Sequence, residues 1–264
     1  MAAHDLDEYF THGAEEPDAP PGSLLGRIES RVREHIAWRL DDGEETRHNV
    51  ASVLREPKRV CEIGCGAGQL GAFLVERGHS YVGIEIDAVA RSLAASRGLE
   101  VFEGVAQEVP PELAGRRFDA VVMSHVLEHV ADLRAAMQTI VTLLGERGVF
   151  VAEVPNNQAV DGHELGATWY WLDVPRHVQF FTGESLTRLC NEQGLRARGL
   201  EYTGFVRHYQ DPWIEKEKRI HDFMAGRGWD GPRSGRRRAW RRLFEAAFLP
   251  DAKRYDSVMV VAER

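Results

Sequence analysis

Short apolar runs alternate with amphipathic segments through the middle of the chain. The runs have the length of strands, whereas the segments between them repeat apolar residues at helical spacing and end at glycines such as Gly78 and Gly98. Strands that alternate with helices imply right-handed crossovers. The pattern therefore predicts an α/β fold whose mainly parallel sheet is covered by helices on both faces. The strand-like runs are RVCEIG, YVGIEI, LEVFEG, FDAVVMS and GVFVAEV.

Further elements are predicted on both sides of this alternation. Apolar residues at helical spacing predict one helix over 24–40 and a second over 44–54. Later in the chain, Thr182 is the expected N-cap of a helix that ends at Gly194. A strand near 198–203 and a last strand, SVMVVAE, complete the prediction.

These elements divide the chain into three predicted units. Residues 1–56 form an N-terminal helical cap, residues 57–204 and 255–264 form the core with the sheet, and residues 205–254 form a helical insertion before the last strand. In parallel sheets, ligands bind outside the carboxyl ends of the strands. Functional residues are therefore expected in the loops that follow strands.

Composition and charge narrow the classes of protein. Of the 264 residues, 43% are hydrophobic and 28% are charged, and the net charge of −8 argues against a general nucleic-acid binder. No apolar run approaches the roughly 20 residues of a membrane span, and the N-terminus has no signal-peptide pattern, so we expect a cytoplasmic protein without a membrane partner. The three cysteines lack zinc-finger spacing. No metal ligands are predicted, although the sequence leaves open whether a metal assists.

The stretch VCEIGCGAGQLG carries four glycines in two overlapping patterns. Read from Gly66 it is the dinucleotide fingerprint G-x-G-x-x-G, and read from Glu62 it is E-x-G-x-G-x-G. The strand VCEI ends at Gly64, and the first glycine of a ligand-binding loop follows its strand directly, so the second pattern fits better. The carboxylate of Glu62 would repel a pyrophosphate but suits an ammonium or sulfonium group. Glu85, about 20 residues further on, is placed to accept hydrogen bonds from ribose hydroxyls.

Four motifs in this order resemble the class I S-adenosylmethionine-dependent methyltransferases. They are EIGCGAG, GIEID, FDAVVMSHVLEHV and LLGERGVFVAEVPN, and the resemblance covers roughly 59–154. The family implies a Rossmann-like, seven-stranded, mainly parallel sheet with helices on both faces, here with the helical cap and the insertion before the last strand. It also implies S-adenosyl-L-methionine as the methyl donor.

The resemblance assigns cofactor roles to residues in loops after strands. Backbone groups of the glycine loop would contact the methionine part, with Glu62 near its ammonium group, while Glu85 holds the ribose. The family often has an acid that binds the adenine amino group, but here Val105 stands at that position, which leaves only backbone groups for this contact. The implied cofactor-binding residues are Glu62, Gly64, Cys65, Gly66, Glu85, Ile86, Val105, Ala106, Ser124 and His125.

A subgroup of the family also carries a W-x-x-D-x-P-R-H…F-T segment, matched here by WYWLDVPRHVQFFT. This subgroup acts in small-molecule, quinone and glycan biosynthesis, so the expected acceptor is a small molecule or glycan-type compound. A hydroxyl acceptor gains from a general base, which is most often histidine. His177 is the first choice because Pro175 and the following capped helix define its position, and His125 and His163 are the other candidates.

The same segment supplies candidate acceptor contacts. Tyr170 and Trp171 are expected to line the acceptor pocket, and Arg176 either binds an acidic group of the acceptor or forms a structural ion pair with Asp173 or Glu184. Each histidine candidate has a structural alternative as a hydrogen-bonded loop residue. Oxygen is preferred over nitrogen because no N-P-P-Y motif is present, although carbon methylation would use similar residues.

Some residues near these motifs have open interpretations. Gly68 and Gly71 are interpreted as packing glycines, and Glu128 and His129 either orient the loop after the fourth strand or face solvent.

The insertion contains the arginine-rich stretch RGWDGPRSGRRRAWRRLF. Arginines among aromatic residues can bind nucleic acid, which makes an RNA or nucleotide methyltransferase one alternative. We prefer an amphipathic helix that serves as a lid or an oligomer contact, in a homodimer for example, with its arginines facing outward. Its apolar stripe would hold Trp240, Leu243, Phe244, Ala247 and Phe248. A second alternative is a protein that binds S-adenosylmethionine without transferring its methyl group.

Overall fold

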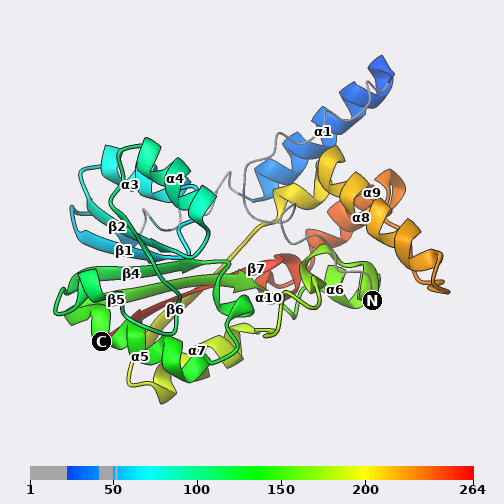
Figure 1. Cartoon of the computed structure of the whole chain (residues 1–264). Coiled ribbons are helices and arrows are strands. Elements are labelled where there is room, and N and C mark those ends of the chain that lie inside the picture. The colour runs from blue at the N-terminus through cyan, green and yellow to red at the C-terminus, as the bar shows by residue number, and fades with distance from the viewer. Residues whose placement is uncertain (1–22, 42–49, 51–52) are drawn as a thin grey trace.

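Seven strands form one sheet in the order β3-β2-β1-β4-β5-β7-β6 (Figure 1). The computed structural model describes residues 23–41, 50 and 53–264. β1 to β5 run parallel, and β7 lies antiparallel between β5 and β6. The predicted seven-stranded, mainly parallel sheet is confirmed. The strands are β1 (Arg59–Ile63), β2 (Ser80–Glu85), β3 (Val101–Glu103), β4 (Phe118–Ser124), β5 (Leu144–Pro155), β6 (Arg196–Thr203) and β7 (Ser257–Glu263).

Helices cover both faces of the sheet, with α3 and α4 on one side and α5 and α7 on the other (Figure 1). Successive residues of a strand point to opposite faces. Accordingly, Val122 of β4 packs in one buried cluster with Leu74 of α3, while Met123 packs in the other with Met137 of α5 and Leu186 of α7. The helices are α3 (Gln69–Glu76), α4 (Ala88–Ser96), α5 (Leu133–Leu143) and α7 (Gly183–Glu192).

The ends of these helices follow the predicted signals. Thr182 caps α7 in a reciprocal capping box with Ser185, and Gly194 follows the helix with a positive φ of 78°. Gly68 and Gly71 are packing glycines, as interpreted from the sequence. A Cβ atom at Gly68 would overlap the side chain of Leu99, and one at Gly71 would overlap the ring of Tyr81.

The strand order changes direction between β1 and β4. The chain moves outward from β1 to β3 and then returns to place β4 on the other side of β1. Such a switch point leaves a crevice at the carboxyl ends of the two strands, which is where ligands bind in open α/β sheets. Gly64 and His125 directly follow these two strands.

A second group of helices stands beside the sheet (Figure 1). One buried cluster joins Ala37 of α1, Phe205 and Tyr209 of the segment after β6, Ile214 of α8 and Leu243 of α9. The predicted helix over 24–40 is confirmed, whereas most of the predicted helix over 44–54 lies outside the described residues. The division into cap, core and insertion stays a prediction. The helices are α1 (Leu24–Leu40), α6 (Val160–Leu165), α8 (Asp211–Ala225), α9 (Arg236–Ala246) and the short α10 (Asp251–Arg254).

The predicted faces of α9 are wrong in two respects. Leu243 is buried, but Phe244 and Phe248 are 73% and 77% exposed, so they do not share the apolar stripe. The arginines do not all face outward either, because Arg238 and Arg242 are largely buried and pair with Asp161 of α6. Opposite charges on α6 turn these two side chains inward, which hydrophobic periodicity alone does not reveal.

Within the described ranges, every helix is too short or too polar to span a bilayer.

Candidate functional site

The glycine loop after β1 is held against the end of β2 by backbone contacts. The N–H groups of Gly64 and Cys65 donate to the carbonyl oxygen of Ile84 at 2.7 and 3.2 Å. Gly64 and Gly66 have φ angles of 73° and 52°, a region that favours glycine. A Cβ atom at Gly64 would overlap Val126, whereas one at Gly66 would meet no atom within 4 Å. The loop is therefore packed on one side and open at Gly66.

Glu85, at the end of β2, lies at this open side of the loop. Its carboxylate accepts hydrogen bonds from the N–H of Gly66 at 2.8 Å and from the N–H of Asp87 at 2.9 Å. The next residue, Ile86, is 58% exposed. Glu85 faces the backbone of the glycine loop, whereas Glu62 is enclosed by side chains.

Glu62 of β1 is buried, with 4% exposure, and the hydroxyl of Tyr81 donates to its Oε2 at 2.5 Å. Burial raises the pKa of this carboxyl to about 8, although the hydrogen bond from Tyr81 opposes the shift. Tyr81 thus gives Glu62 a structural partner.

The other predicted cofactor residues lie on neighbouring loops. Ala106 is buried and Val105 half-buried in the loop after β3. The hydroxyl of Ser124, at the end of β4, donates to the carboxylate of Glu153 at 3.4 Å. His125 follows with a positive φ of 54°, which turns the chain sharply at the tip of β4.

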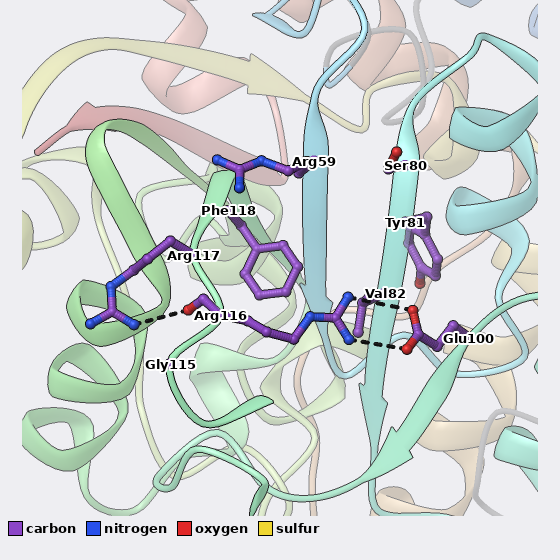
Figure 2. A pocket seen from close by; sticks show the side chains of 9 residues that line it. All are labelled: Arg59, Ser80, Tyr81, Val82, Glu100, Gly115, Arg116, Arg117 and Phe118. Atoms are coloured by element: carbon purple, nitrogen blue, oxygen red, sulfur yellow. Dashed lines mark hydrogen bonds and ion pairs between the residues drawn. The ribbon is translucent and has the colours of Figure 1, made fainter. Parts of the chain in front are cut away.

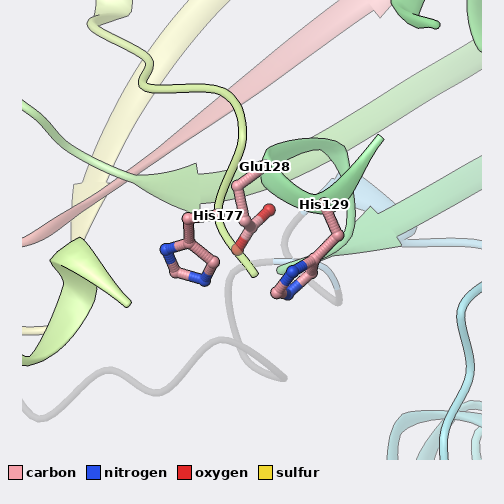
Figure 3. A group of neighbouring side chains, drawn as sticks. All are labelled: Glu128, His129 and His177. Carbon is pink, nitrogen blue, oxygen red and sulfur yellow. The ribbon is translucent and has the colours of Figure 1, made fainter. Parts of the chain in front are cut away.

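Two histidines and a glutamate gather beyond this turn (Figure 3). Glu128 and His129 belong to the short helix η3 (Leu127–His129), and His177 comes from the segment before α7. One potential ligand atom from each of the three residues lies within 4.8 Å of the other two. Residues far apart in the sequence are thus brought to one point.

Backbone hydrogen bonds position this cluster. The carbonyl oxygen of Glu128 accepts from the N–H groups of Val178 and Gln179 at 2.9 and 3.1 Å, which ties the segment of His177 to η3. Nδ1 of His177 lies 2.8 Å from the carbonyl oxygen of Trp171, and Nδ1 of His129 lies 3.1 Å from that of Arg176. A carbonyl oxygen can only accept, so both Nδ1 atoms carry hydrogen, and in the neutral form of each ring Nε2 keeps its lone pair.

The side chain of Glu128 is 1% exposed, and neither of its oxygens has a hydrogen-bond partner within the described residues. Nδ1 of His125 lies 3.3 Å from Oε1 without the geometry of a hydrogen bond. Burial alone would lower the pKa of His125, but the neighbouring carboxylates of Glu128 and Glu153 outweigh it and raise the pKa. For His177, burial is the largest influence and lowers the pKa. Because the side chain of Glu128 is buried, the interpretation that it faces solvent is wrong.

Trp171 connects the cluster to the rest of the fold. Its ring stacks on that of His125, with centroids 4.6 Å apart and planes at 5°, and its Nε1 donates to Asp256 at 2.6 Å. The guanidinium of Arg207 lies over the Trp171 ring at 4.8 Å and also pairs with Asp256. Burial alone would raise the pKa of Asp256, but Arg207 and His208 hold it well below its usual range. The sequence offered no signal for Asp256 and Arg207, which are separated from Trp171 by dozens of residues.

The remaining candidates have distinct surroundings. The ring of Tyr170 packs edge-on against that of Trp213, with centroids 4.5 Å apart. Arg176 forms the ion pair with Asp173 that was one of its two sequence interpretations. His163 lies exposed on α6 and is not a member of the cluster of Glu128, His129 and His177.

A pocket of about 430 Å³ lies at the opposite edge of the sheet (Figure 2). It opens at the amino ends of β1, β2 and β4, where Arg59, Ser80 and Phe118 begin the strands. Two of its arginines are paired, Arg59 with Asp119 and Arg116 with Glu100. The pocket is therefore separate from the loops that carry the predicted site.

The sheet, the glycine loop and Glu85 together define a Rossmann-like methyltransferase of class I. A family model described as a methyltransferase domain matches residues 34–199, more than half of the chain. The chain belongs to this family, and S-adenosylmethionine is its methyl donor.

Two curated relatives carry the name ubiquinone biosynthesis O-methyltransferase. The protein from Aeromonas salmonicida is 30% identical over 154 residues, which cover 54% of this chain and 65% of that protein. The protein from Leptothrix cholodnii is 25% identical over 184 residues, covering 64% of this chain and 77% of that protein. The match thus spans just under two thirds of the Aeromonas protein.

Solved structures share the fold at low identity. A SAM-dependent methyltransferase from Archaeoglobus fulgidus superposes with a TM-score of 0.54 at 17% identity, covering 86% of this chain and 97% of that one. An S-adenosylmethionine-dependent methyltransferase from Mesorhizobium loti gives a TM-score of 0.51 at 15% identity, with coverages of 79% and 91%.

The residues at the loop fit the cofactor. Glu85 offers a carboxylate acceptor beside Gly66, where the backbone is open, and the exposed side chain of Ile86 offers an apolar surface next to it. These are the groups that a ribose and an adenine ring require.

Proposed function

We propose that this protein transfers a methyl group from S-adenosylmethionine to a hydroxyl oxygen of a small-molecule acceptor. The observation that carries the proposal is the convergence of lone-pair-bearing histidine nitrogens and a buried carboxylate beside the tip of β4. The similarity to ubiquinone biosynthesis O-methyltransferases supports an oxygen acceptor of small size.

The cofactor is assigned to the carboxyl ends of β1, β2 and β4. When bound, it supplies a methyl group carried on a positively charged sulfur. Backbone groups of the glycine loop would hold its methionine part, with Glu62 acting through water, and Glu85 would exchange its contact with Gly66 for the ribose hydroxyls. The residues proposed to hold it are Glu62, Gly64, Cys65, Gly66, Glu85, Ile86, Val105, Ala106, Ser124 and His125.

A histidine of the cluster is proposed to assist the loss of the acceptor proton. Nδ1 of His177 is engaged by the Trp171 carbonyl, so its Nε2 is the atom that would face the acceptor, and the lowered pKa keeps the ring neutral near neutral pH. His125 is the second candidate because its Nδ1 lies 3.3 Å from Glu128 of the cluster, and His163, exposed on α6, is the weakest. Proton removal by a positioned base contributes roughly 10²–10⁴-fold to a rate.

Tyr170, Trp171 and Arg176 are proposed to line the acceptor side, whether the acceptor is a plain small molecule or a glycan-type compound. The ion pairs of Arg238, Arg241 and Arg242 with acids of α6 and α9 reduce the support for an RNA-binding insertion. An oligomer contact through α9 and the turn after it stays a proposal, supported by the exposed rings of Phe244 on α9 and Phe248 just beyond it. The cytoplasmic location expected from the sequence also stays a prediction.

The test is a methyl-transfer assay with acceptors that carry phenol, catechol, sugar or amine groups. We expect S-adenosylhomocysteine release together with a product that gains one methyl group on oxygen, located by nuclear magnetic resonance. A methyl group on nitrogen or carbon would contradict the oxygen assignment. Cofactor binding by calorimetry with no transfer to any acceptor class would favour the non-catalytic alternative.

A further inference from the structure

Glu128 has an environment that ordinary packing does not explain. Its side chain is 1% exposed, and both carboxylate oxygens lack hydrogen-bond partners among the described residues. A buried carboxylate costs several kcal/mol unless cations and hydrogen bonds compensate it. Nδ1 of His125 lies within ion-pair distance of Oε1, at 3.3 Å, but does not hydrogen-bond to it, so this contact compensates the carboxylate only in part.

His129 and His177 present the complementary half of a cation site. Nδ1 of each ring hydrogen-bonds to a backbone carbonyl oxygen, so in the neutral ring the lone pair of Nε2 is available to bind a cation. This is the arrangement that fixes the tautomer and orientation of histidines bound to metals. The carboxylate of Asp173 approaches Nε2 of His177 only to 3.9 Å and is itself paired with Arg176.

The three groups lie close enough to share one ion. Their potential ligand atoms are within 4.8 Å of one another. Atoms that bind one ion at about 2.0–2.2 Å lie about 3.4 Å apart, so side-chain shifts of roughly 1 Å are sufficient. Figure 3 shows the carboxylate of Glu128 between the two imidazole rings. Glu128 and His177 are buried while His129 is exposed, which provides a path for an ion to enter.

We propose that Glu128, His129 and His177 bind a divalent transition-metal ion. Two imidazoles with one carboxylate suit ions such as Zn²⁺, Mn²⁺ or Co²⁺ and leave coordination positions open. This proposal replaces the prediction of no metal ligands. The sequence did not reveal the three residues as a group because they meet only in the folded chain. Metal binding itself does not depend on the proposed function, but the role of the ion does.

That role is to bind the acceptor oxygen. A hydroxyl group that coordinates a divalent ion has a lowered pKa and would lose its proton to water, so His177 would act as a ligand of the ion and no longer as the base. His125 contacts Glu128 but is not one of the three proposed ligands. The consequence is that activity requires the ion, whereas a simple histidine base requires none.

The first experiment measures metal binding without any assay of activity. The full chain is freed of metal by dialysis against a chelator and titrated with Co²⁺ followed by visible absorption, and with Zn²⁺ followed by calorimetry. We expect one ion per chain. Glu128→Gln and His129→Ala should each weaken binding by roughly 10²-fold or more, since even residues that merely support metal ligands contribute 10–100-fold.

The controls keep the outcome interpretable. His129 is exposed, so His129→Ala should fold even if a change at the buried Glu128 does not, and thermal melting checks both. Glu100→Gln and His35→Ala, which alter exposed residues far from the cluster along the chain, should bind the ion as the wild type does. Absence of one-to-one binding, or binding that both cluster variants retain, would overturn the metal site.

The second experiment separates this inference from the proposed function. Methyl transfer is measured with metal-free protein and again after one equivalent of Zn²⁺, Mn²⁺ or Co²⁺. Transfer that depends on the ion supports both proposals. Full transfer by metal-free protein that binds no ion overturns the metal site and leaves the methyltransferase proposal intact. Ion binding without transfer to any acceptor leaves the metal site and overturns the proposed function.

Discussion

The two sides of the candidate site are built in different ways. On the cofactor side, backbone N–H groups and one carboxylate, that of Glu85, meet within two consecutive strand–loop units. On the acceptor side, side chains of η3, of the segment before α7 and of the segment after β6 come together, with Trp171 linking them. The cofactor side is formed by residues close together in the sequence, whereas the acceptor side is formed by long-range packing. Changes on the two sides should therefore separate cofactor binding from turnover.

The largest effect is expected for His177→Ala. Whether His177 accepts a proton or binds an ion, its loss should lower turnover by roughly 10²–10⁴-fold, while the Kd for S-adenosylmethionine stays nearly unchanged. Steady-state kinetics and calorimetry measure the two quantities. His35→Ala, on the exposed face of α1, is the control. Unchanged turnover in His177→Ala would remove this residue from the reaction.

Asp256→Ala should produce the next largest effect, on stability. The variant removes the shared partner of Arg207 and His208 and the acceptor of the Trp171 N–H. Breaking a buried pair costs about 3–5 kcal/mol, because charges remain buried without compensation. Chemical denaturation measures the loss, with the exposed Asp230→Ala as the control. If Asp256→Ala lost no more stability than Asp230→Ala, the contacts of Asp256 would not stabilise the acceptor side.

Glu85→Ala tests the cofactor side. Hydrogen bonds to a charged group contribute about 1.5–3 kcal/mol, so the Kd for S-adenosylmethionine should rise by about 10–100-fold. Turnover at saturating cofactor should fall much less than in His177→Ala. The control is Glu100→Ala, which lies just before β3. If the variant lost turnover but kept its cofactor affinity, the division between the two sides would be wrong.

The smallest effect is expected for Glu62→Gln and concerns pH. Burial raises the folded pKa of Glu62 from 4.5 to about 8, so the folded state binds this proton more tightly than the unfolded state. The free energy of unfolding of the wild type should therefore fall as pH rises from about 4.5 to about 8. Glutamine does not titrate, so the variant should gain at least about 1.4 kcal/mol relative to the wild type over this interval, the equivalent of one pKa unit.

Urea denaturation at several pH values, without cofactor, measures this difference. Glu100→Gln changes an exposed carboxyl and should follow the wild type. Parallel curves for Glu62→Gln and the wild type would mean that Glu62 is ionised in the folded protein throughout.

The order and bounds of the elements follow closely from local sequence. Thr182 caps its helix and Gly194 ends it, because the capping side chain and the left-handed turn act within a few residues. The faces of α9 did not follow. Phe244 lies in solvent and Arg238 in a buried ion pair, because α6, distant in the chain, supplies Asp161 as its partner.

The sequence by itself determined the seven-stranded fold, the glycine loop and the position of Glu85. These depend on hydrophobic period, on the left-handed backbone that only glycine adopts easily, and on the alignment of neighbouring parallel strands. The tertiary structure alone decided that Glu128 is buried with no hydrogen-bond partner in the described part of the chain and that His177 lies beside it. That placement results from backbone hydrogen bonds between η3 and the segment of His177, which join residues whose spacing along the chain carries no periodic signal.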